Sequence, residues 1–109
     1  MVALYPDKPI LITEFGAGGI PGYHSMPALK WSEEYQSQHL QRSIETMLGN
    51  NHVAGCFIWQ YCDILSHPAR ALGRPRSSNN KGIVDEYRRP KLSYFTIRDL
   101  FARIAAETG

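Results

Sequence analysis

The chain has 109 residues, of which 43% are hydrophobic and 20% are charged, and its formal net charge is +2. This balance is typical of a globular chain and excludes an acidic disordered tail, a collagen-like repeat and a disulfide-dense miniature domain. The small net charge does not indicate a nucleic-acid partner, and no stretch reaches the roughly 18 to 20 apolar residues of a membrane helix.

The two cysteines and the N-terminal residues bear on the cellular compartment. Cys56 and Cys62 lie on or beside one apolar run, which favours free thiols in a reducing compartment over a disulfide. The first eight residues lack the basic start and the apolar block of an export signal. We therefore expect a cytoplasmic domain that contacts neither a membrane nor a nucleic acid.

The first half of the chain predicts one strand and one helix. The apolar run from Lys8 to Glu14 shows no polar alternation, which indicates a strand buried on both faces, as in parallel sheets. A glycine-rich loop follows over residues 16–22. Ser32 is a suitable N-cap for a helix with two acids in its first turn, and Gly49 is a natural stop. The apolar stripe of this helix is predicted to be Leu40, Ile44, Met47 and Leu48.

The second half predicts another strand and another helix. Residues 53–61 form a second continuous apolar run. Residues 62–90 are rich in Pro, Gly, Ser and Asn, which predicts a long irregular loop of a length typical of functional loops. After Pro90 an amphipathic helix is predicted, with apolar positions at Tyr94, Ile97, Phe101, Ile104 and Ala105.

The order strand, helix, strand, helix predicts an α/β chain with a parallel sheet, in a single partial-barrel domain over residues 1–109. A closed (β/α)8 barrel uses eight strands and roughly 250 residues, so two βα units amount to a quarter of one. Two helices cannot cover both faces of strands this apolar. We therefore expect adhesive sheet edges, completed by further parts of a longer protein or by several copies of the chain.

A carboxylate stands at the end of the first predicted strand. In barrels the carboxyl ends of the strands carry the catalytic groups, and Glu14 lies at such an end. A carboxylate there suits nucleophilic or acid–base chemistry. The alternative is a glutamate that accepts hydrogen bonds from nearby backbone amides, and position alone does not separate the two.

Several short segments carry a family resemblance. They are Ile12–Gly16, Gly22–Met26, Trp31–Gln36, Phe57–Asp63 and Asn79–Ile83, the last followed by Arg88, Pro90 and Lys91. In this order they resemble glycoside hydrolase family 2, the group of β-glucuronidases and β-galactosidases. The segment around Glu14 resembles the nucleophile strand of that family. The resemblance covers the last two βα units of the catalytic (β/α)8 barrel.

The resemblance implies a retaining β-glycosidase, β-glucuronidase-like or β-galactosidase-like, in which Glu14 attacks the anomeric carbon. A second carboxylic acid about 5 Å away would protonate the leaving oxygen and then activate water. In the family this acid belongs to an Asn-Glu pair, and the sequence contains no such dipeptide. Two hypotheses follow: a homo-oligomer, tetrameric or larger, whose chains complete the site, and an inactive barrel fragment that self-associates and binds sugar weakly.

The resemblance also implies a set of substrate-binding residues. Asn79 and Lys81 match the pair that binds the sugar carboxylate in β-glucuronidases, although their spacing alone favours a polar turn. Trp59 is predicted as an apolar platform for a sugar ring or, alternatively, as a core residue. His24 and Asp63 complete the predicted set. Asp63 is expected to orient its neighbours by hydrogen bonding or to cap a loop.

Basic charge gathers around the Asn79–Lys81 pair and favours an anionic ligand, although a solvated face or pairing with acids of another subunit are alternatives. The basic residues are Arg70, Arg74, Arg76, Lys81, Arg88, Arg89 and Lys91. Ser77 and Ser78 stand where the family has Gly-Gly, and the family's arginine before this motif is out of register. The preferred glycone therefore stays open.

Neither a cofactor nor a metal is expected. Residues 16–21 begin like a dinucleotide-binding fingerprint, but Pro21 stands where the third glycine belongs. The four histidines are scattered, and none lies at zinc-site spacing from Cys56 or Cys62. The expected ligand is a β-glycoside.

Overall fold

A computed structural model describes residues 6–108, without the side chains at positions 69, 71, 76 and 108. The elements are strand β1 (Ile10–Phe15), helix α1 (Glu33–Leu48), strand β2 (Val53–Ile58), the short helix α2 (Pro68–Ala71), the 3-10 turn η1 (Pro75–Ser77) and helix α3 (Leu92–Thr108). The predictions for residues 1–5 and for the side chain of Arg76 concern parts of the chain outside the described residues.

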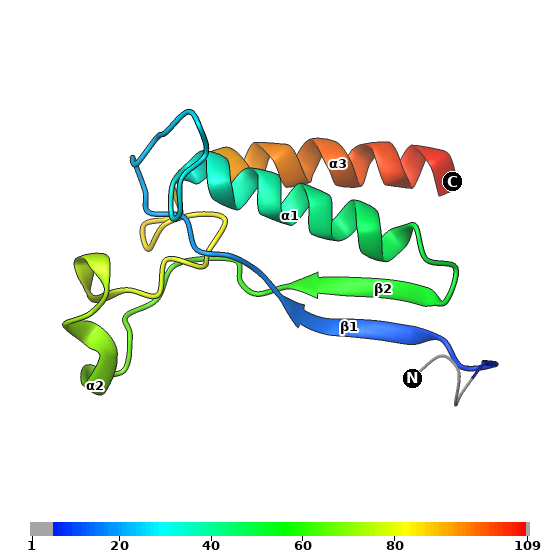
Figure 1. Cartoon of the computed structure of the whole chain (residues 1–109), viewed down its shortest axis with the longest axis horizontal. Helices are drawn as coiled ribbons and strands as arrows, with labels where there is room; N and C mark the ends of the chain where they lie inside the picture. Colours follow the sequence, from blue (N-terminus) through cyan, green and yellow to red (C-terminus); the bar gives the residue numbers. More distant parts are fainter. Residues whose placement is uncertain (1–5, 109) are drawn as a thin grey trace.

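The two strands confirm the predicted parallel α/β arrangement. β1 and β2 pair in parallel, with Ile10 opposite Val53 and Phe15 opposite Ile58. In Figure 1 the helices α1 and α3 lie over one face of this pair, and the loops that leave the carboxyl ends of both strands gather on one side. The topology therefore brings the loop after Glu14 and the long loop after β2 to the same end of the molecule.

Local signals determine where α1 begins and ends. The Ser32 hydroxyl accepts a hydrogen bond from the Tyr35 N–H at 3.1 Å and caps the helix, and Glu33 and Glu34 occupy the first turn. Gly49 caps the carboxyl end. The predicted bounds of this helix are therefore confirmed, because they depend on side-chain-to-backbone contacts that span only a few residues.

The core lies between the two long helices and the covered face of the sheet. Leu40 and Ile44 of α1 pack against Ile97 and Leu100 of α3. The partly buried residues packed against them are Phe15, Leu48, Cys56, Ile58, Ile83 and Ile104. Three positions of the stripe predicted for α1, namely Leu40, Ile44 and Leu48, therefore face the core.

Two positions predicted for the apolar stripe of α3 are wrong. Phe101 is 43% exposed and Ala105 is also exposed, whereas Leu100 is buried. Ile97 and Leu100 are buried and Ile104 is partly buried, at spacings of three and four residues. The predictions for Ile97 and Ile104 are therefore confirmed, and Leu100 takes the place predicted for Phe101. The predicted irregular loop over residues 62–90 is also wrong in part, because it contains α2, η1 and isolated β-bridges.

The face of the sheet turned away from the helices is uncovered. Leu11 is 57% exposed and Phe57 is 60% exposed, although their neighbours Cys56 and Ile58 pack into the core. Successive side chains of a strand point to opposite faces, so Phe57 marks the uncovered face. The apolar runs predict that both faces of the strands are buried. This prediction is confirmed only for the face that the helices cover.

Candidate active site

Glu14 lies near the carboxyl end of β1, and its side chain is exposed. The pairing with β2 is irregular between Ile12 and Phe15. Irregularities of this kind are common next to active sites, where they change the direction of a side chain. Gly16 follows at a point of close approach, because a Cβ there would overlap the carbonyl oxygen of Trp59. The Trp59 N–H donates to the Phe15 carbonyl at 2.8 Å, which fixes the two strand ends side by side.

Trp59 is the predicted sugar platform on the second strand end. Its side chain is 44% exposed, and the peptide bond to Gln60 is cis. The ring is therefore open to a ligand instead of lying in the core. Glu14 and Trp59 come from neighbouring strand ends and lie at the same end of the sheet.

Asn79 and Lys81 flank a tight turn. Asn80 between them has a φ of 54°, a left-handed conformation that asparagine tolerates. The Asn79 side-chain oxygen accepts a hydrogen bond from the Lys81 N–H at 3.2 Å, so the amide group of this side chain keeps its N–H donors available. Lys81 is exposed, and among the described residues no acid forms an ion pair with it.

A pocket of about 370 Å³ opens beside this turn. Its lining consists of Gly18, Ile20, Trp31, Gly73, Arg74, Pro75, Ser78, Asn79, Asn80 and Lys81. Two cationic side chains, amide donors and an aromatic ring suit the binding of a carboxylate next to an apolar ring face. Of the residues predicted as substrate-binding, Asn79 and Lys81 line this pocket, whereas the side chains of Glu14, Trp59, His24 and Asp63 lie outside its lining.

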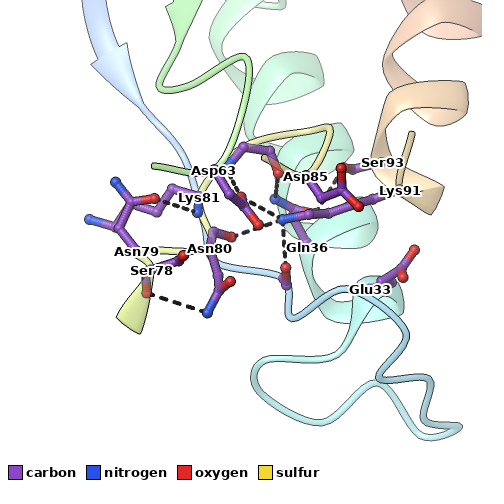
Figure 2. A network of polar contacts seen from close by, with 12 residues as sticks. Glu33, Gln36, Asp63, Ser78, Asn79, Asn80, Lys81, Asp85, Lys91 and Ser93 are labelled. Carbon is purple, nitrogen blue, oxygen red and sulfur yellow. Dashed lines mark hydrogen bonds and ion pairs between the residues drawn. The ribbon is translucent and has the colours of Figure 1, made fainter. Parts of the chain in front are cut away.

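Asp63 and Lys91 form an ion pair in the interior, with Oδ1 and Nζ 2.8 Å apart and almost no exposed side-chain surface. Figure 2 shows Lys91 reaching from the start of α3 to Asp63 and Asn80. The loop-capping alternative for Asp63 fits, because its Oδ1 also accepts the Gly82 N–H at 2.8 Å. Direct contact between Asp63 and a sugar does not fit a carboxylate without exposed surface. Lys91 likewise contributes no charge to the surface, contrary to its place in the predicted basic group.

Burial dominates the ionisation of this pair. It raises the pKa of Asp63, and it lowers the pKa of Lys91, in both cases against the opposing effect of the partner. Both directions are those expected for charged groups that are removed from water. The geometry shows that the pair fixes the arrangement of the groups around it, since Lys91 Nζ and Asp63 Oδ1 each also contact backbone atoms of other segments.

Gln36 is a buried polar residue that the sequence prediction missed. Its Nε2 group donates to the carbonyls of Ala17 at 3.1 Å and Gly82 at 2.9 Å, and its Oε1 accepts from the Ser93 hydroxyl at 2.8 Å. The signal was present in the sequence, because residue 36 precedes Leu40 by one helical turn on the apolar face of α1.

His24 binds the acidic start of α1. Its Nδ1 lies 2.7 Å from an oxygen of Glu34, and this hydrogen bond, together with the charge of Glu33, raises the pKa of His24. Glu33 accepts the N–H groups of Gly22 and Leu92, both at 2.7 Å, and so joins the loop before α1 to the start of α3. These contacts give His24 a place in the scaffold of this loop, outside the pocket beside Asn79.

Part of the predicted basic group is neutralised locally. The Arg89 Nε atom lies 2.7 Å from Oδ2 of Asp85, and Arg88 donates to the Glu86 carbonyl at 3.0 Å. The cationic side chains that line the pocket are Arg74 and Lys81. Arg70 and Arg88 lie outside the pocket lining, so Arg74 and Lys81 are the cations that an anionic ligand in the pocket can contact.

Three further observations concern metals, membranes and thiols. Within residues 6–108 no three His, Cys, Asp or Glu side chains gather as metal ligands. None of the helices in that range is long and apolar enough to span a membrane. Cys56 and Cys62 are free, and burial raises the pKa of the Cys56 thiol.

The family profile described as "Glycosyl hydrolases family 2, TIM barrel domain" matches residues 3–106. The chain belongs to glycoside hydrolase family 2. The resemblance stated from the motifs is confirmed, and the two βα units are part of the TIM barrel domain of this family. The β-glucuronidase of Mus musculus is 40% identical over 107 residues and that of Homo sapiens 37% over 109. Each alignment covers 94% of this chain and 16% of the relative, so the chain spans about a sixth of the length of these relatives.

Solved structures of family 2 enzymes share the fold of the chain. A β-galacturonidase of Eisenbergiella tayi bound to galacturonate is 50% identical, with a TM-score of 0.79 over 84% of this chain and 17% of that chain. A β-glucuronidase of an uncultured Clostridium is 31% identical, with a TM-score of 0.81 over 94% of this chain and 17% of that chain.

Proposed function

We propose that the chain is the nucleophile-bearing part of a retaining β-glycosidase that acts on β-uronides, either glucuronides or galacturonides. The observation that favours a uronide as substrate is the composition of the pocket. It is lined by Lys81, which forms no ion pair among the described residues, and by Asn79, whose side-chain N–H donors are available. A uronic acid differs from a neutral hexose by a carboxylate at C6, which such a cation and amide recognise. Relatives named as β-glucuronidase and β-galacturonidase support this substrate class.

Glu14 is the nucleophile in this proposal. Its carboxylate attacks the anomeric carbon, the bond to the leaving oxygen breaks, and a glycosyl ester of Glu14 forms. An acid about 5 Å away gives its proton to the leaving oxygen and then takes a proton from the water that hydrolyses the ester. Two displacements at the same carbon restore the β configuration. The exposed position of Glu14 at the carboxyl end of β1 supports its role.

The acid and the missing strands come from outside this segment. The open face of the sheet, marked by Leu11 and Phe57, is the surface on which further strands would close a barrel. We infer that the isolated chain covers this face by homo-oligomerisation, to a tetramer or larger, since four copies would supply eight strands. Further segments of a longer polypeptide would cover the same face in the same way.

The test is turnover of matched aryl β-glycosides with activated leaving groups, which depend least on the missing acid. The panel contains the glucuronide, galacturonide, glucoside and galactoside, each assayed with protein free of host glycosidases. We expect the uronides to be hydrolysed faster than their neutral counterparts. Glu14→Gln should lower turnover by at least about 10³-fold, because it removes the attacking carboxylate, whereas Glu107→Gln, an exposed acid on α3, should not.

Two outcomes would contradict the proposal. Turnover that Glu14→Gln leaves undiminished would remove Glu14 from the role of nucleophile. Absence of hydrolysis from an assembled, folded protein would favour the alternative of an inactive barrel fragment with weak sugar binding.

A further inference from the structure

Three buried side chains from three separate segments of the chain converge on the backbone around the Asn79–Lys81 turn. Asp63 follows β2, Gln36 belongs to α1, and Lys91 directly precedes α3 (Figure 2). Their polar groups are hydrogen-bonded to backbone atoms of Ala17, Gly19, Asn80 and Gly82. Asn80 lines the pocket, and the pocket-lining Gly18 lies between the contacted residues Ala17 and Gly19.

The contacts hold the turn immediately before and immediately after Lys81. Lys91 Nζ donates to the carbonyl of Asn80 at 3.2 Å and to that of Gly19 at 2.7 Å. On the other side, the Gly82 N–H is bonded to Asp63 and the Gly82 carbonyl to Gln36. Gly82 fits this position because a Cβ there would overlap the backbone of the segment that carries Asp63.

The position of the Lys91 ammonium group carries two energetic costs, which suggests a role beyond stabilising the fold. A cation at the amino end of α3 is opposed by the helix dipole, and its burial removes it from water. A methionine at this position, combined with a neutral residue in place of Asp63, would avoid both penalties. What the ammonium adds is three directed hydrogen bonds to Asp63, Asn80 and Gly19, which join three segments far apart in sequence.

We propose that Asp63 and Lys91 are positioning residues that set the preference of the pocket for a uronate over a neutral sugar. The inference rests on the proposed function, because it concerns the same pocket. By fixing the backbone on both sides of Lys81, the pair aims the ammonium of Lys81 and the amide of Asn79 at one carboxylate. When the pair is removed, the turn relaxes and the carboxylate loses aligned partners, whereas contacts to a neutral ring do not depend on this turn.

The test compares galacturonate with galactose as probes for the full chain, with dissociation constants measured by calorimetric or NMR titration. The variants are Lys91→Met, which keeps the length of the side chain, and the double variant Asp63→Asn with Lys91→Met, which leaves no unpaired buried charge. Lys8→Met, an exposed lysine outside the pocket, is the matched control. We expect the preference for galacturonate to fall about tenfold or more in the first two proteins, as for a lost hydrogen bond to a charged group. Lys8→Met and the affinity for galactose should not change.

A direct variant separates this inference from the proposed function. If Lys81→Met abolishes the galacturonate preference and Lys91→Met leaves it intact, the positioning role is overturned while carboxylate recognition stands. If Lys81→Met also has no effect, recognition of the carboxylate by this pocket is itself wrong. Equal loss of affinity for both sugars would assign Asp63 and Lys91 a merely structural role.

Folding of the variants is checked by circular dichroism. Should neither variant fold, hydrogen exchange in the unmodified chain decides. A Gly82 amide that exchanges as slowly as the core amide of Ile44 supports a held turn. A Gly82 amide that exchanges as fast as that of the fully exposed Leu72 overturns it.

Discussion

Charged residues act in this fold through the backbone groups that they face. Glu33 and Glu34 lie in the first turn of α1, where the helix dipole favours acids, and they also accept N–H groups from the preceding loop. Glu33 also accepts a hydrogen bond from the first N–H of α3. A few carboxylates therefore hold the loop after β1 and the starts of both long helices together.

The His24–Glu34 pair predicts a pH dependence of stability. The pKa of His24 is raised above its ordinary 6.5, so its contribution is complete below that value and is lost as the pH rises through the raised pKa. Burial opposes ionisation of Glu34, but the hydrogen bonds from His24 and Ser25 prevail and lower its pKa below 4.5, so its contribution is lost as the pH falls through the lowered value. The pair therefore stabilises the fold most between these two ordinary values.

His24→Gln is expected to lower the free energy of unfolding at about pH 5.5 and to have little effect at about pH 9, where the imidazole is neutral. Urea denaturation at both pH values measures this. The control is His52→Gln, because His52 is exposed and forms no ion pair among residues 6–108. A loss of stability that is equal at both pH values would show that the charge of His24 is not involved.

At the scale of single elements, α1 follows from short-range rules. Ser32→Ala removes the cap of the Tyr35 N–H and should lower the free energy of unfolding by about 1 kcal/mol. Ser43→Ala, in the interior of the same helix, should change it little because alanine is the better helix former. Urea denaturation of the three proteins checks this, and equal effects of the two substitutions would contradict the capping role.

Elements and their order could be predicted from the sequence, whereas the polar contacts between elements could not. The strand runs, Ser32 and Gly49 act over a few residues, and the motif around Glu14 indicated the family. Lys91 was placed among surface charges because lysine is rarely buried. Only the fold brings it within reach of Asp63, 28 residues away. The burial of Gln36 follows from its place on the apolar face of α1, but its hydrogen-bond partners lie in other segments, 19 and 46 positions distant.

For the whole molecule, the open face of the sheet is the dominant feature. Phe57 on this face is 60% exposed, and burying such a side chain is worth roughly 1.5–3 kcal/mol. We therefore expect Phe57→Lys to weaken the proposed self-association by about tenfold or more, as measured by sedimentation velocity. Phe101→Lys, on the exposed side of α3, should leave association unchanged. Dissociation by Phe101→Lys alone would place the interface on the helical side.

The close approach at Gly82 limits how the pocket can be redesigned. Even alanine at this position would collide with neighbouring backbone, so variant libraries directed at a new glycone should keep residue 82 constant. Variation is better directed to Arg74 and Asn79, whose side chains border the cavity. The Asn79 side chain makes one hydrogen bond to the turn, which it accepts from the Lys81 N–H. Tolerance to mutation should therefore change abruptly within a few residues of one turn.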